Sequence, residues 1–238
     1  MKVFVSGGSR GIGRAIALRF ARDGAESVAI GYLRNDAAAE ETAAELRAAG
    51  ADPILVRGNI TSERVVEEVR ALGPLDVLVH NAATGVVRPA LEAEEKHWDW
   101  TLNANARALL SLAQAAAPQM PDGSSIVAIS SLGSQRVLEN YTLIGVSKAA
   151  LEALVRYLAV ELSPAIRVNA VSAGVVETGA LEHFPNKDEM LRAGSANPAG
   201  RMVTPDDVAA AVAFLCSPDA SMIRGHVLVV DGGFTLPV

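Results

Sequence analysis

Short apolar runs alternate with longer segments rich in alanine, leucine, glutamate and arginine, and this alternation constrains the fold more than any other feature. The apolar runs predict seven β-strands, at residues 2–5, 27–32, 53–57, 75–80, 124–130, 166–171 and 226–230. The segments between them predict six helices, at residues 11–23, 36–49, 62–72, 94–117, 143–162 and 205–216. Nearly continuous apolar runs are typical of strands that helices cover on both faces. We therefore expect an α/β fold with a single doubly wound parallel sheet and right-handed crossovers.

The composition bounds the size of the core and the class of partner. With 238 residues, 50% of them hydrophobic, the chain is long enough to bury one large core, so we expect a single domain over residues 1–238. A net charge of −6 provides no general basic surface. This argues against nucleic acid and against membranes as partners.

Cysteine content and the first residues bear on the compartment. Cys216 is the single cysteine, so we expect a small apolar helix residue in a reducing compartment, not a catalytic thiol. The N-terminal residues follow a strand pattern without the charged and apolar regions of a signal peptide. Charged residues or glycine interrupt every long apolar run before it reaches the length of a membrane span. Together these features predict a cytoplasmic protein.

One long segment, from Thr178 to Thr204, has little periodicity and contains His183, Pro185 and Asn186. In a doubly wound fold it follows the carboxyl end of a late strand, which is the edge of the sheet where ligands bind. We predict that residues 178–204 form a lid over a substrate.

A glycine-rich loop follows the first strand. Gly7, Gly11 and Gly13 lie in the sequence Ser-Gly-Gly-Ser-Arg-Gly-Ile-Gly, directly before a predicted helix. Glycines allow a tight turn and a close backbone approach to a pyrophosphate, and the helix N-terminus offers free N–H groups to the phosphates. An ordinary glycine-rich turn is the alternative. The position between the first strand and the first helix favours a Rossmann-type dinucleotide site instead.

The end of the second strand bears on which dinucleotide binds. Proteins that prefer NAD usually carry a carboxylate there for the adenosine ribose, whereas this chain has Gly31, Tyr32, Leu33 and Arg34. Guanidinium groups match phosphate geometry, so Arg34 and Arg10 would pair with a 2′-phosphate. We predict NADPH as the cofactor. Solvated surface charge is the alternative for both arginines.

Tyr141 and Lys148 are separated by six residues, and residue 144, where a more familiar pattern has its tyrosine, is isoleucine. A step of seven residues turns an α-helix by about 700°, close to two full turns, so both side chains project from one face. The spacing keeps the pair together and moves the hydroxyl one turn along the helix. Taken singly, each residue would be a solvated helix residue, but together they predict a proton donor beside a bound dinucleotide.

These features resemble the short-chain dehydrogenase/reductase family over essentially the full length, as do Asn81-Ala82-Ala83 after the fourth strand and Ser130-Ser131 after the fifth. The resemblance implies a cofactor site whose members, with Lys148, are Gly7, Ser9, Arg10, Gly11, Ile12, Gly13, Arg34, Asn59, Ile60, Asn81, Ala82, Ala83, Gly174, Val176 and Thr178. It also implies that Asn105, seven residues after Trp98, supports a proton-relay water. The chain departs from the family pattern at Ser6, Asn59, Ala83 and Ala173.

The six-residue gap before Lys148 is similar to the enoyl-acyl-carrier-protein reductase branch of that family. The stretches HWDWTLNANARALL, HFPN, NPAGRMV and GHVLVVDGGFTLPV resemble the NADPH-dependent type III form, and so does Ser131, which stands seventeen residues before Lys148. The resemblance implies reduction of the C2–C3 double bond of a trans-2-enoyl thioester carried by acyl carrier protein or coenzyme A. It also implies a role in fatty acid or related acyl-chain synthesis and a homotetramer.

Charge development in that reaction suggests a role for each candidate catalytic residue, namely Tyr141, Lys148, Ser131 and Asn105. Hydride addition at C3 sends negative charge to the thioester oxygen, which requires a donor, and Tyr141 is the candidate. Lys148 would hold the nicotinamide ribose, favour the anion and lower the pKa of Tyr141. A proton would reach C2 through Lys148 and Asn105. Ser131 would touch the substrate or cap its loop.

Two alternatives stay open: a 3-ketoacyl-thioester or other carbonyl reductase of the same family, and an NADP-binding regulator or scaffold without activity.

The histidines and tryptophans favour structural roles. We expect His80 to be hydrogen-bonded at the end of a buried strand. His97 and His183 lack the spaced partners of a metal site, and we predict no metal. Trp98 and Trp100 are expected to pack or to lie at a subunit interface. The apolar residues 234–238 are expected to dock on a neighbouring subunit.

Overall fold

The computed structural model describes residues 1–179, 181 and 187–236. Seven parallel strands form one sheet in the order β3-β2-β1-β4-β5-β6-β7. The strands are β1 (Lys2–Ser6), β2 (Ser27–Tyr32), β3 (Asp52–Arg57), β4 (Val77–His80), β5 (Ser125–Ser131), β6 (Arg167–Ala173) and β7 (Val227–Val230). The predicted doubly wound sheet is confirmed, with each strand within two residues of its predicted bounds. The strand order reverses between β1 and β4, the point at which ligands bind in such sheets.

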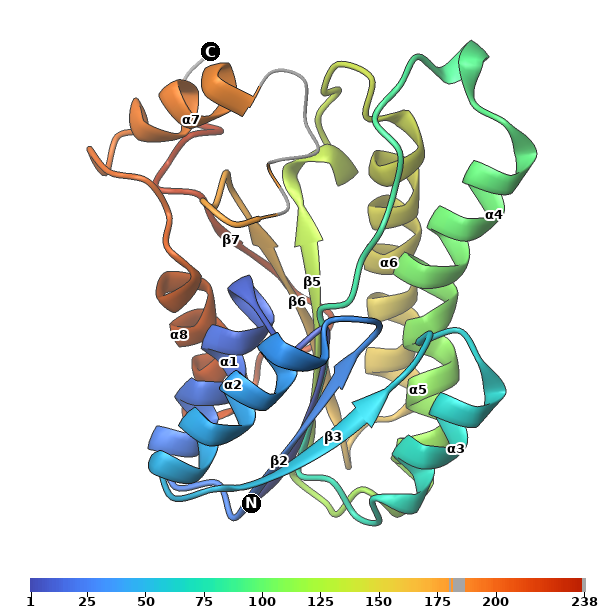
Figure 1. The fold of residues 1–238 in the computed structure, drawn as a ribbon, viewed down its shortest axis with the longest axis vertical. Coiled ribbons are helices and arrows are strands. Elements are labelled where there is room, and N and C mark those ends of the chain that lie inside the picture. The colour runs from blue at the N-terminus through green and yellow to red at the C-terminus, as the bar shows by residue number, and fades with distance from the viewer. Residues whose placement is uncertain (180, 182–186, 237–238) are drawn as a thin grey trace.

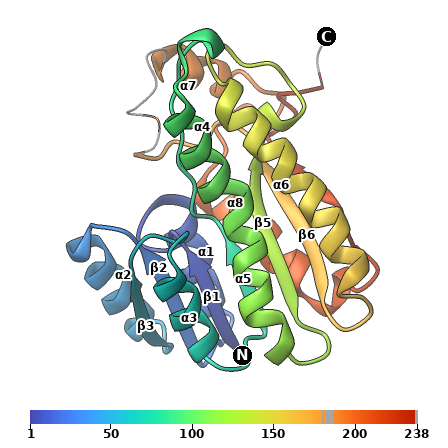
Figure 2. The ribbon, with the colours of Figure 1, turned by 90° about the vertical axis from the view of Figure 1, so that its right-hand side faces the viewer.

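Helices cover both faces of the sheet (Figures 1 and 2). On one face lie α1 (Gly11–Arg22), α2 (Asp36–Ala48) and α8 (Pro205–Cys216). The other face carries α3 (Glu63–Ala71), α4 (Glu95–Leu102), α5 (Ala108–Ala116) and α6 (Thr142–Glu161). Val3 and Val5 pack on the first face and Phe4 on the second, because successive strand residues point to opposite sides.

The segment predicted as one helix over residues 94–117 contains a π-helical turn (Asn103–Arg107) between α4 and α5. Such turns insert one extra residue into a helix and redirect the side chains that follow. Here the Asn105 carbonyl accepts a hydrogen bond from the ring of His80 on the neighbouring strand (3.1 Å). A contact between segments distant in sequence therefore stabilises an irregularity that local pattern does not encode.

The predicted lid contains a helix that the sequence did not indicate, α7 (Lys187–Ser195). It lies beyond the carboxyl ends of the strands (Figures 1 and 2). An isolated parallel bridge between Val176 and Val203 joins the two ends of the segment. His183, Pro185 and Asn186 lie outside the described residues, as do residues 237 and 238 of the apolar C-terminal tail.

Cys216 ends α8 and packs against the core on the α1 face. Burial raises the pKa of its thiol to about 12, so it is protonated at neutral pH and is a poor nucleophile, as expected. Within the part of the chain that the structure describes, no helix is both long and apolar enough to cross a bilayer.

Candidate active site

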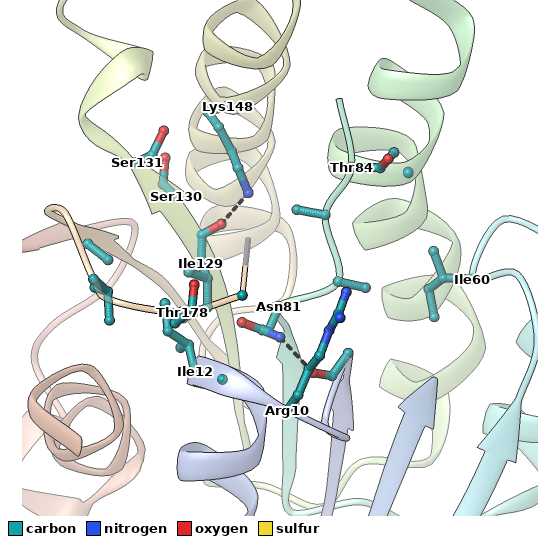
Figure 3. A pocket seen from close by; sticks show the side chains of 18 of the residues that line it. Arg10, Ile12, Ile60, Asn81, Thr84, Ile129, Ser130, Ser131, Lys148 and Thr178 are labelled. Atoms are coloured by element: carbon teal, nitrogen blue, oxygen red, sulfur yellow. Dashed lines mark hydrogen bonds between the residues drawn. The ribbon is translucent and has the colours of Figure 1, made fainter. Parts of the chain in front are cut away.

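A cavity of about 680 Å³ opens at the carboxyl ends of the strands, beside the reversal between β1 and β4. Most of the predicted site residues line it: Gly7, Ser9, Arg10, Gly11, Ile12, Asn59, Ile60, Asn81, Ala82, Ala83, Ser131, Tyr141, Lys148, Gly174, Val176 and Thr178. Figure 3 shows Lys148 above Ile129 on one side of the cavity and Arg10 on the other. Segments from residue 7 to residue 178 therefore meet at one edge of the sheet.

The glycine loop forms the floor of the cavity. Gly7 has φ +67°, a left-handed conformation that favours glycine. A Cβ on Gly13 would collide with the carbonyl oxygen of Gly7, so glycine at 13 lets α1 pack directly against the loop. The Asn81 amide donates to the Ser6 and Gly7 carbonyl oxygens (3.1 and 3.0 Å) and holds the loop to β4. The close backbone packing thus places the start of helix α1 at the cavity, where Gly11 and Ile12 line it.

The loop offers a cradle that fits a pyrophosphate. Among the described residues, the N-cap of α1, Arg10, makes no side-chain hydrogen bond to the first turn of its helix. By contrast, Asn35 caps α2, Ser62 caps α3 and Thr204 caps α8 with side-chain oxygens. Uncapped N–H groups at a helix start suit an anionic ligand, and the Arg10 side chain at the cavity wall adds positive charge.

A buried hydrogen-bond chain links the loop to the helices behind it. The Ser6 hydroxyl oxygen accepts from the Asn81 and Ala82 N–H groups (3.0 and 2.9 Å) and lies 3.1 Å from His80 Nδ1. His80 Nε2 donates to the Asn105 carbonyl oxygen, so Nδ1 accepts the Ser6 hydroxyl proton. Burial, followed by the Lys148 charge, lowers the pKa of His80 to about 4, so its ring is neutral. The expected hydrogen-bonded histidine is confirmed.

Tyr141 and Lys148 share one wall of the cavity with Ser131. Tyr141 is the N-cap of α6, and its hydroxyl lies 3.3 Å from the Ser131 hydroxyl. Lys148 is 6% exposed, and its ammonium donates to the Ile129 carbonyl oxygen at 2.7 Å (Figure 3). Burial lowers the pKa of Lys148 to about 8. Both side chains therefore line the same cavity, Tyr141 bonded to Ser131 and Lys148 bonded to Ile129.

The pKa of Tyr141 differs from the sequence-based expectation. Burial raises it above its usual value, and the hydrogen bond with Ser131 opposes that rise. We expected Lys148 to lower this pKa. That expectation is wrong, because the shift comes from burial, which disfavours the phenolate, and from the opposing Ser131 hydrogen bond. The phenol is therefore protonated at neutral pH and ready to donate.

Gly13, Arg34 and Asn105 are not among the described residues that line the cavity. Gly13 serves helix packing, and Arg34 is exposed beside Leu33, which does line the cavity. Asn105 is fully buried behind the wall: its Oδ1 accepts from the Thr84 N–H (2.8 Å), and its Nδ2 donates to the Thr84 carbonyl and the Ser147 hydroxyl (2.9 and 2.8 Å). The Asn105 side chain thus holds the loop after β4 through Thr84, a contact that the sequence did not predict.

Sequence reasoning missed Glu152, a buried carboxylate one turn after Lys148 on α6. It accepts hydrogen bonds from the Ser130 hydroxyl (2.6 Å) and the Gln135 amide (3.4 Å). Its charge raises the pKa of Lys148 and so offsets part of the effect of burial. The i,i+4 spacing from Lys148 was the available signal.

The sequence predicted a substrate lid over residues 178–204 but did not identify the apolar part of the cavity lining. This part is lined by Trp100, Leu138, Leu181, Met190 and Phe234. They come from α4, from the loop before α6, from the lid segment and from the C-terminal region. Trp100 was expected to serve packing or a subunit interface, whereas it lines the cavity. Among the described residues, no group of three or more histidine, cysteine, aspartate or glutamate side chains is arranged to hold a metal.

Comparisons with known proteins agree with this geometry. A family model described as enoyl-(acyl carrier protein) reductase matches residues 7–235. The chain is similar to 1-cyclohexenylcarbonyl-CoA reductase of Streptomyces collinus, with 38% identity over 98% of the chain and 86% of the relative. It is 34% identical to a hydroxynaphthalene reductase-like protein of Metarhizium brunneum, over 96% of the chain and 92% of that protein.

The fold comparison gives the same result. The chain superposes on a short-chain dehydrogenase from Burkholderia cenocepacia J2315, crystallised with NADP, with a TM-score of 0.89 and 35% identity. The match covers 98% of this chain and 96% of that one. With a family match over nearly its whole length and relatives that share both sequence and fold, the chain belongs to the short-chain dehydrogenase/reductase family of oxidoreductases.

Proposed function

We propose that this protein is an NADPH-dependent reductase of the C2–C3 double bond of enoyl thioesters. The observation that carries the proposal is that Tyr141, Ser131 and Lys148 line one cavity, with the Tyr141 and Ser131 hydroxyls in contact, while Ile144 is buried. Ile144, four residues before Lys148, is 8% exposed and packs against Gly85. The phenol of Tyr141 is therefore the hydroxyl donor that α6 presents to the cavity, one turn earlier than in the more familiar pattern.

The residues present fit a dinucleotide. Tight glycine packing, the uncapped start of α1 and the Arg10 side chain suit a pyrophosphate, and Asn59 and Ile60 line the cavity beyond β3, where the adenine would lie. Lys148 would hold the nicotinamide ribose, and Gly174, Val176 and Thr178 would lie near the nicotinamide end. When bound, the reduced nicotinamide supplies the hydride.

NADPH is favoured over NADH by the residues at the end of β2. Tyr32 and Leu33 line the cavity where a carboxylate would select NADH, and exposed Arg34 follows them. Arg10 and Arg34 would give a 2′-phosphate charge-assisted hydrogen bonds. The Burkholderia relative crystallised with NADP supports the same preference.

Tyr141 acts on the substrate oxygen. Addition of hydride at C3 moves the electron pair of the double bond toward the thioester, so negative charge gathers on its oxygen. Because burial keeps the Tyr141 phenol protonated, it donates a hydrogen bond to that oxygen as the charge develops. The Ser131 hydroxyl, 3.3 Å from the phenol oxygen, orients the donor.

Lys148 supplies positive charge next to the developing anion. Its ammonium, held by the Ile129 carbonyl, is a fixed charge in a buried wall, where electrostatic effects are stronger than in water. A proton from solvent reaches C2 past Lys148 and completes the reduction. Asn105 holds the loop at Thr84, and we assign it a positioning role in place of the relay.

The apolar part of the cavity lining and the Streptomyces relative both indicate the substrate class. Trp100, Leu138, Leu181, Met190 and Phe234 suit an acyl chain or ring. The Streptomyces relative is named for an unsaturated acyl-coenzyme A whose double bond is conjugated with the thioester. We propose enoyl groups on coenzyme A or acyl carrier protein, in fatty acid or related acyl-chain synthesis.

The test offers purified protein crotonyl and acetoacetyl thioesters and follows NADPH absorbance. We expect turnover of the crotonyl thioester, and about a 100-fold lower rate in Tyr141→Phe with unchanged NADPH affinity, because the phenol acts only as charge develops. Turnover of the acetoacetyl thioester alone would favour a carbonyl reductase of the same family. NADPH binding with no turnover of either would leave a regulator or scaffold.

We further propose a cytoplasmic homotetramer. Tyr157 and Val160 lie on α6, are 70% and 77% exposed, and offer apolar area that a subunit contact would cover. Phe234 lines the cavity, so the start of the C-terminal tail packs within its own chain.

A further inference from the structure

The Tyr141 ring lies against a glycine. Gly133 is in a 3₁₀ turn (Leu132–Ser134) that follows β5 directly. A Cβ atom on Gly133 would stand 2.5 Å from both Cδ1 and Cε1 of Tyr141, which is closer than two non-bonded carbon atoms can approach. Gly133 is not among the glycines with positive φ, so its backbone conformation is open to alanine. The need for glycine at 133 is therefore a need for space, and the group that takes the space is the phenol ring.

A second glycine faces the first from α6. A Cβ on Gly145 would lie 2.6 Å from the Gly133 carbonyl oxygen and 3.7 Å from Tyr141 Cδ1. The Gly145 N–H donates to the Tyr141 carbonyl at 2.8 Å, which starts the helix at the tyrosine itself. The turn after β5 and the first turn of α6 are thus in backbone contact, with the phenol ring against both.

The contact of the Tyr141 ring with Gly133 fixes the position of the Tyr141 hydroxyl. With the ring against Gly133, the phenol oxygen reaches 3.3 Å from the Ser131 hydroxyl, two residues earlier in the same segment. The ring has no freedom to move toward the turn.

We infer that Gly133 and Gly145 form a seat for the Tyr141 ring and are positioning residues for the proton donor. The expected effects on reaction rate rest on the proposed function, whereas the packing of the ring against the two glycines does not. A tyrosine one helical turn ahead of its usual place needs such a seat, because its ring must fit between α6 and the turn after β5. Gly133 and Gly145 thus provide the space that a tyrosine seven residues before Lys148 requires.

The first arm of the test is kinetic. Gly133→Ala is expected to lower the kcat of crotonyl-thioester reduction about 10- to 100-fold, because a displacement of about 1 Å at a reacting group costs up to that factor. The NADPH Kd should stay within about twofold, since the glycine loop is untouched. In a Tyr141→Phe background, Gly133→Ala should cause no further loss, because the hydroxyl it displaces is already gone. An equal loss in both backgrounds, or full activity of Gly133→Ala, would overturn the inference.

The second arm measures packing without substrate. Gly133→Ala should lower the Tm of the protein, and Tyr141→Ala should restore most of that loss by removing the ring that the new methyl group meets. The same cycle with Gly85→Ala, whose Cβ would meet Ile144, should show no rescue by Tyr141→Ala. If Gly133→Ala unfolds the protein and the double variant does too, glycine serves the backbone and the inference fails.

The two arms separate this inference from the proposed function. If the wild-type protein fails to reduce the crotonyl thioester, the proposed function is wrong, while rescue of Tm by Tyr141→Ala still supports the seat. If reduction occurs and neither cycle shows coupling, the seat is wrong and the function stands.

Discussion

At the scale of single residues, burial controls the protonation of the site. It raises the pKa of Tyr141 and lowers the pKa values of Lys148 and His80, and in each case it favours the neutral form. The phenol is protonated and the imidazole is neutral, so Lys148 carries the positive charge of this wall. Glu152 opposes the effect of burial on Lys148, and with its pKa at about 8 the ammonium is charged at neutral pH.

The pKa of Lys148 predicts the alkaline limit of activity. Since it is lowered from 10.5 to about 8, the ammonium is charged below about pH 8 and loses its proton above it. We expect kcat/KM to fall as pH rises through about 8, because kcat/KM reports the free enzyme. Glu152→Gln removes the charge that holds the pKa up, so the fall should move to lower pH. Profiles of kcat/KM against pH for both proteins measure this shift.

Ser130→Ala is the matched control for the pH profile. It removes the hydrogen bond to Glu152 but leaves the carboxylate charge beside Lys148. Its alkaline limit should stay close to that of the wild type. Superimposable profiles for wild type and Glu152→Gln would contradict the role given to Lys148.

Arg10 and Arg34 differ in position, and this refines the prediction for cofactor choice. Arg10 lines the cavity, whereas Arg34 is exposed beside it. Arg10→Ala and Arg34→Ala should each raise the KM for NADPH, by about 10- to 100-fold, because a hydrogen bond to a charged group contributes about 1.5–3 kcal/mol. The KM for NADH should change little in Arg34→Ala, whereas Arg10→Ala should raise it as well, because Arg10 also lies at the pyrophosphate cradle. Arg34→Asp should move preference toward NADH.

Arg47→Ala controls for a general loss of positive charge. Arg47 lies in the last turn of α2, at the end away from the helix start that follows Arg34. Its KM values for both cofactors should equal those of the wild type. Unchanged NADPH and NADH constants in Arg34→Asp would remove Arg34 from the cofactor site.

At the scale of elements, the π-helical turn between α4 and α5 shapes the wall of the site. Its π-helical turn brings Ala104 to the cavity wall and leaves Asn105 buried behind it. The Asn105 carbonyl is bonded to His80, and its side chain is bonded to Thr84 and Ser147. One residue therefore joins a strand end, a loop and α6 around the site, and its side-chain polar atoms are hydrogen-bonded although it is fully buried.

Helix α4 also provides a test of substrate choice. Trp98 and Trp100 are 45% and 54% exposed, but among the described lining residues Trp100 is present and Trp98 is absent. Residues two apart on a helix face different sides. Trp100→Ala should lower kcat/KM for a ring-containing or long-chain enoyl thioester about tenfold more than for the crotonyl thioester, since lost apolar contact costs about 1–3 kcal/mol.

Trp98→Ala is the matched control on the same helix. It removes an equally large and similarly exposed side chain, and its ratio of long-chain to crotonyl kcat/KM should match the wild type. Equal ratios in Trp100→Ala and the wild type would exclude Trp100 from the acyl site. Comparison of the two variants also separates substrate contact from any effect on helix packing.

At the scale of the whole molecule, the order of the strands builds the site. All seven strands are parallel, so their carboxyl ends meet at one edge, where residues from Gly7 to Phe234 share a cavity. The glycine loop and the Tyr141 wall lie on either side of the reversal between β1 and β4. Cofactor and substrate residues are thereby brought together from opposite ends of the chain.

Local sequence pattern was sufficient to predict the architecture, the glycine loop and the candidate pair Tyr141 and Lys148. Apolar runs predicted every strand, because a strand covered on both faces must be apolar along its length. The glycine loop and the pair Tyr141 and Lys148 were predicted because turn geometry and helical spacing act over a few residues. The lid helix α7 was missed, since a helix of nine residues that includes Gly194 spans few turns on which a pattern can show.

Contacts between distant segments decided the rest. The π-helical turn depends on His80, the burial of Asn105 on Thr84 and Ser147, and the place of Trp100 on the path of α4 past the cavity. The space for the Tyr141 ring exists because the turn at Gly133 meets α6 at Gly145. None of these follows from neighbours along the chain, because burial and close approach are properties of packed surfaces that form only when the sheet and its helices come together.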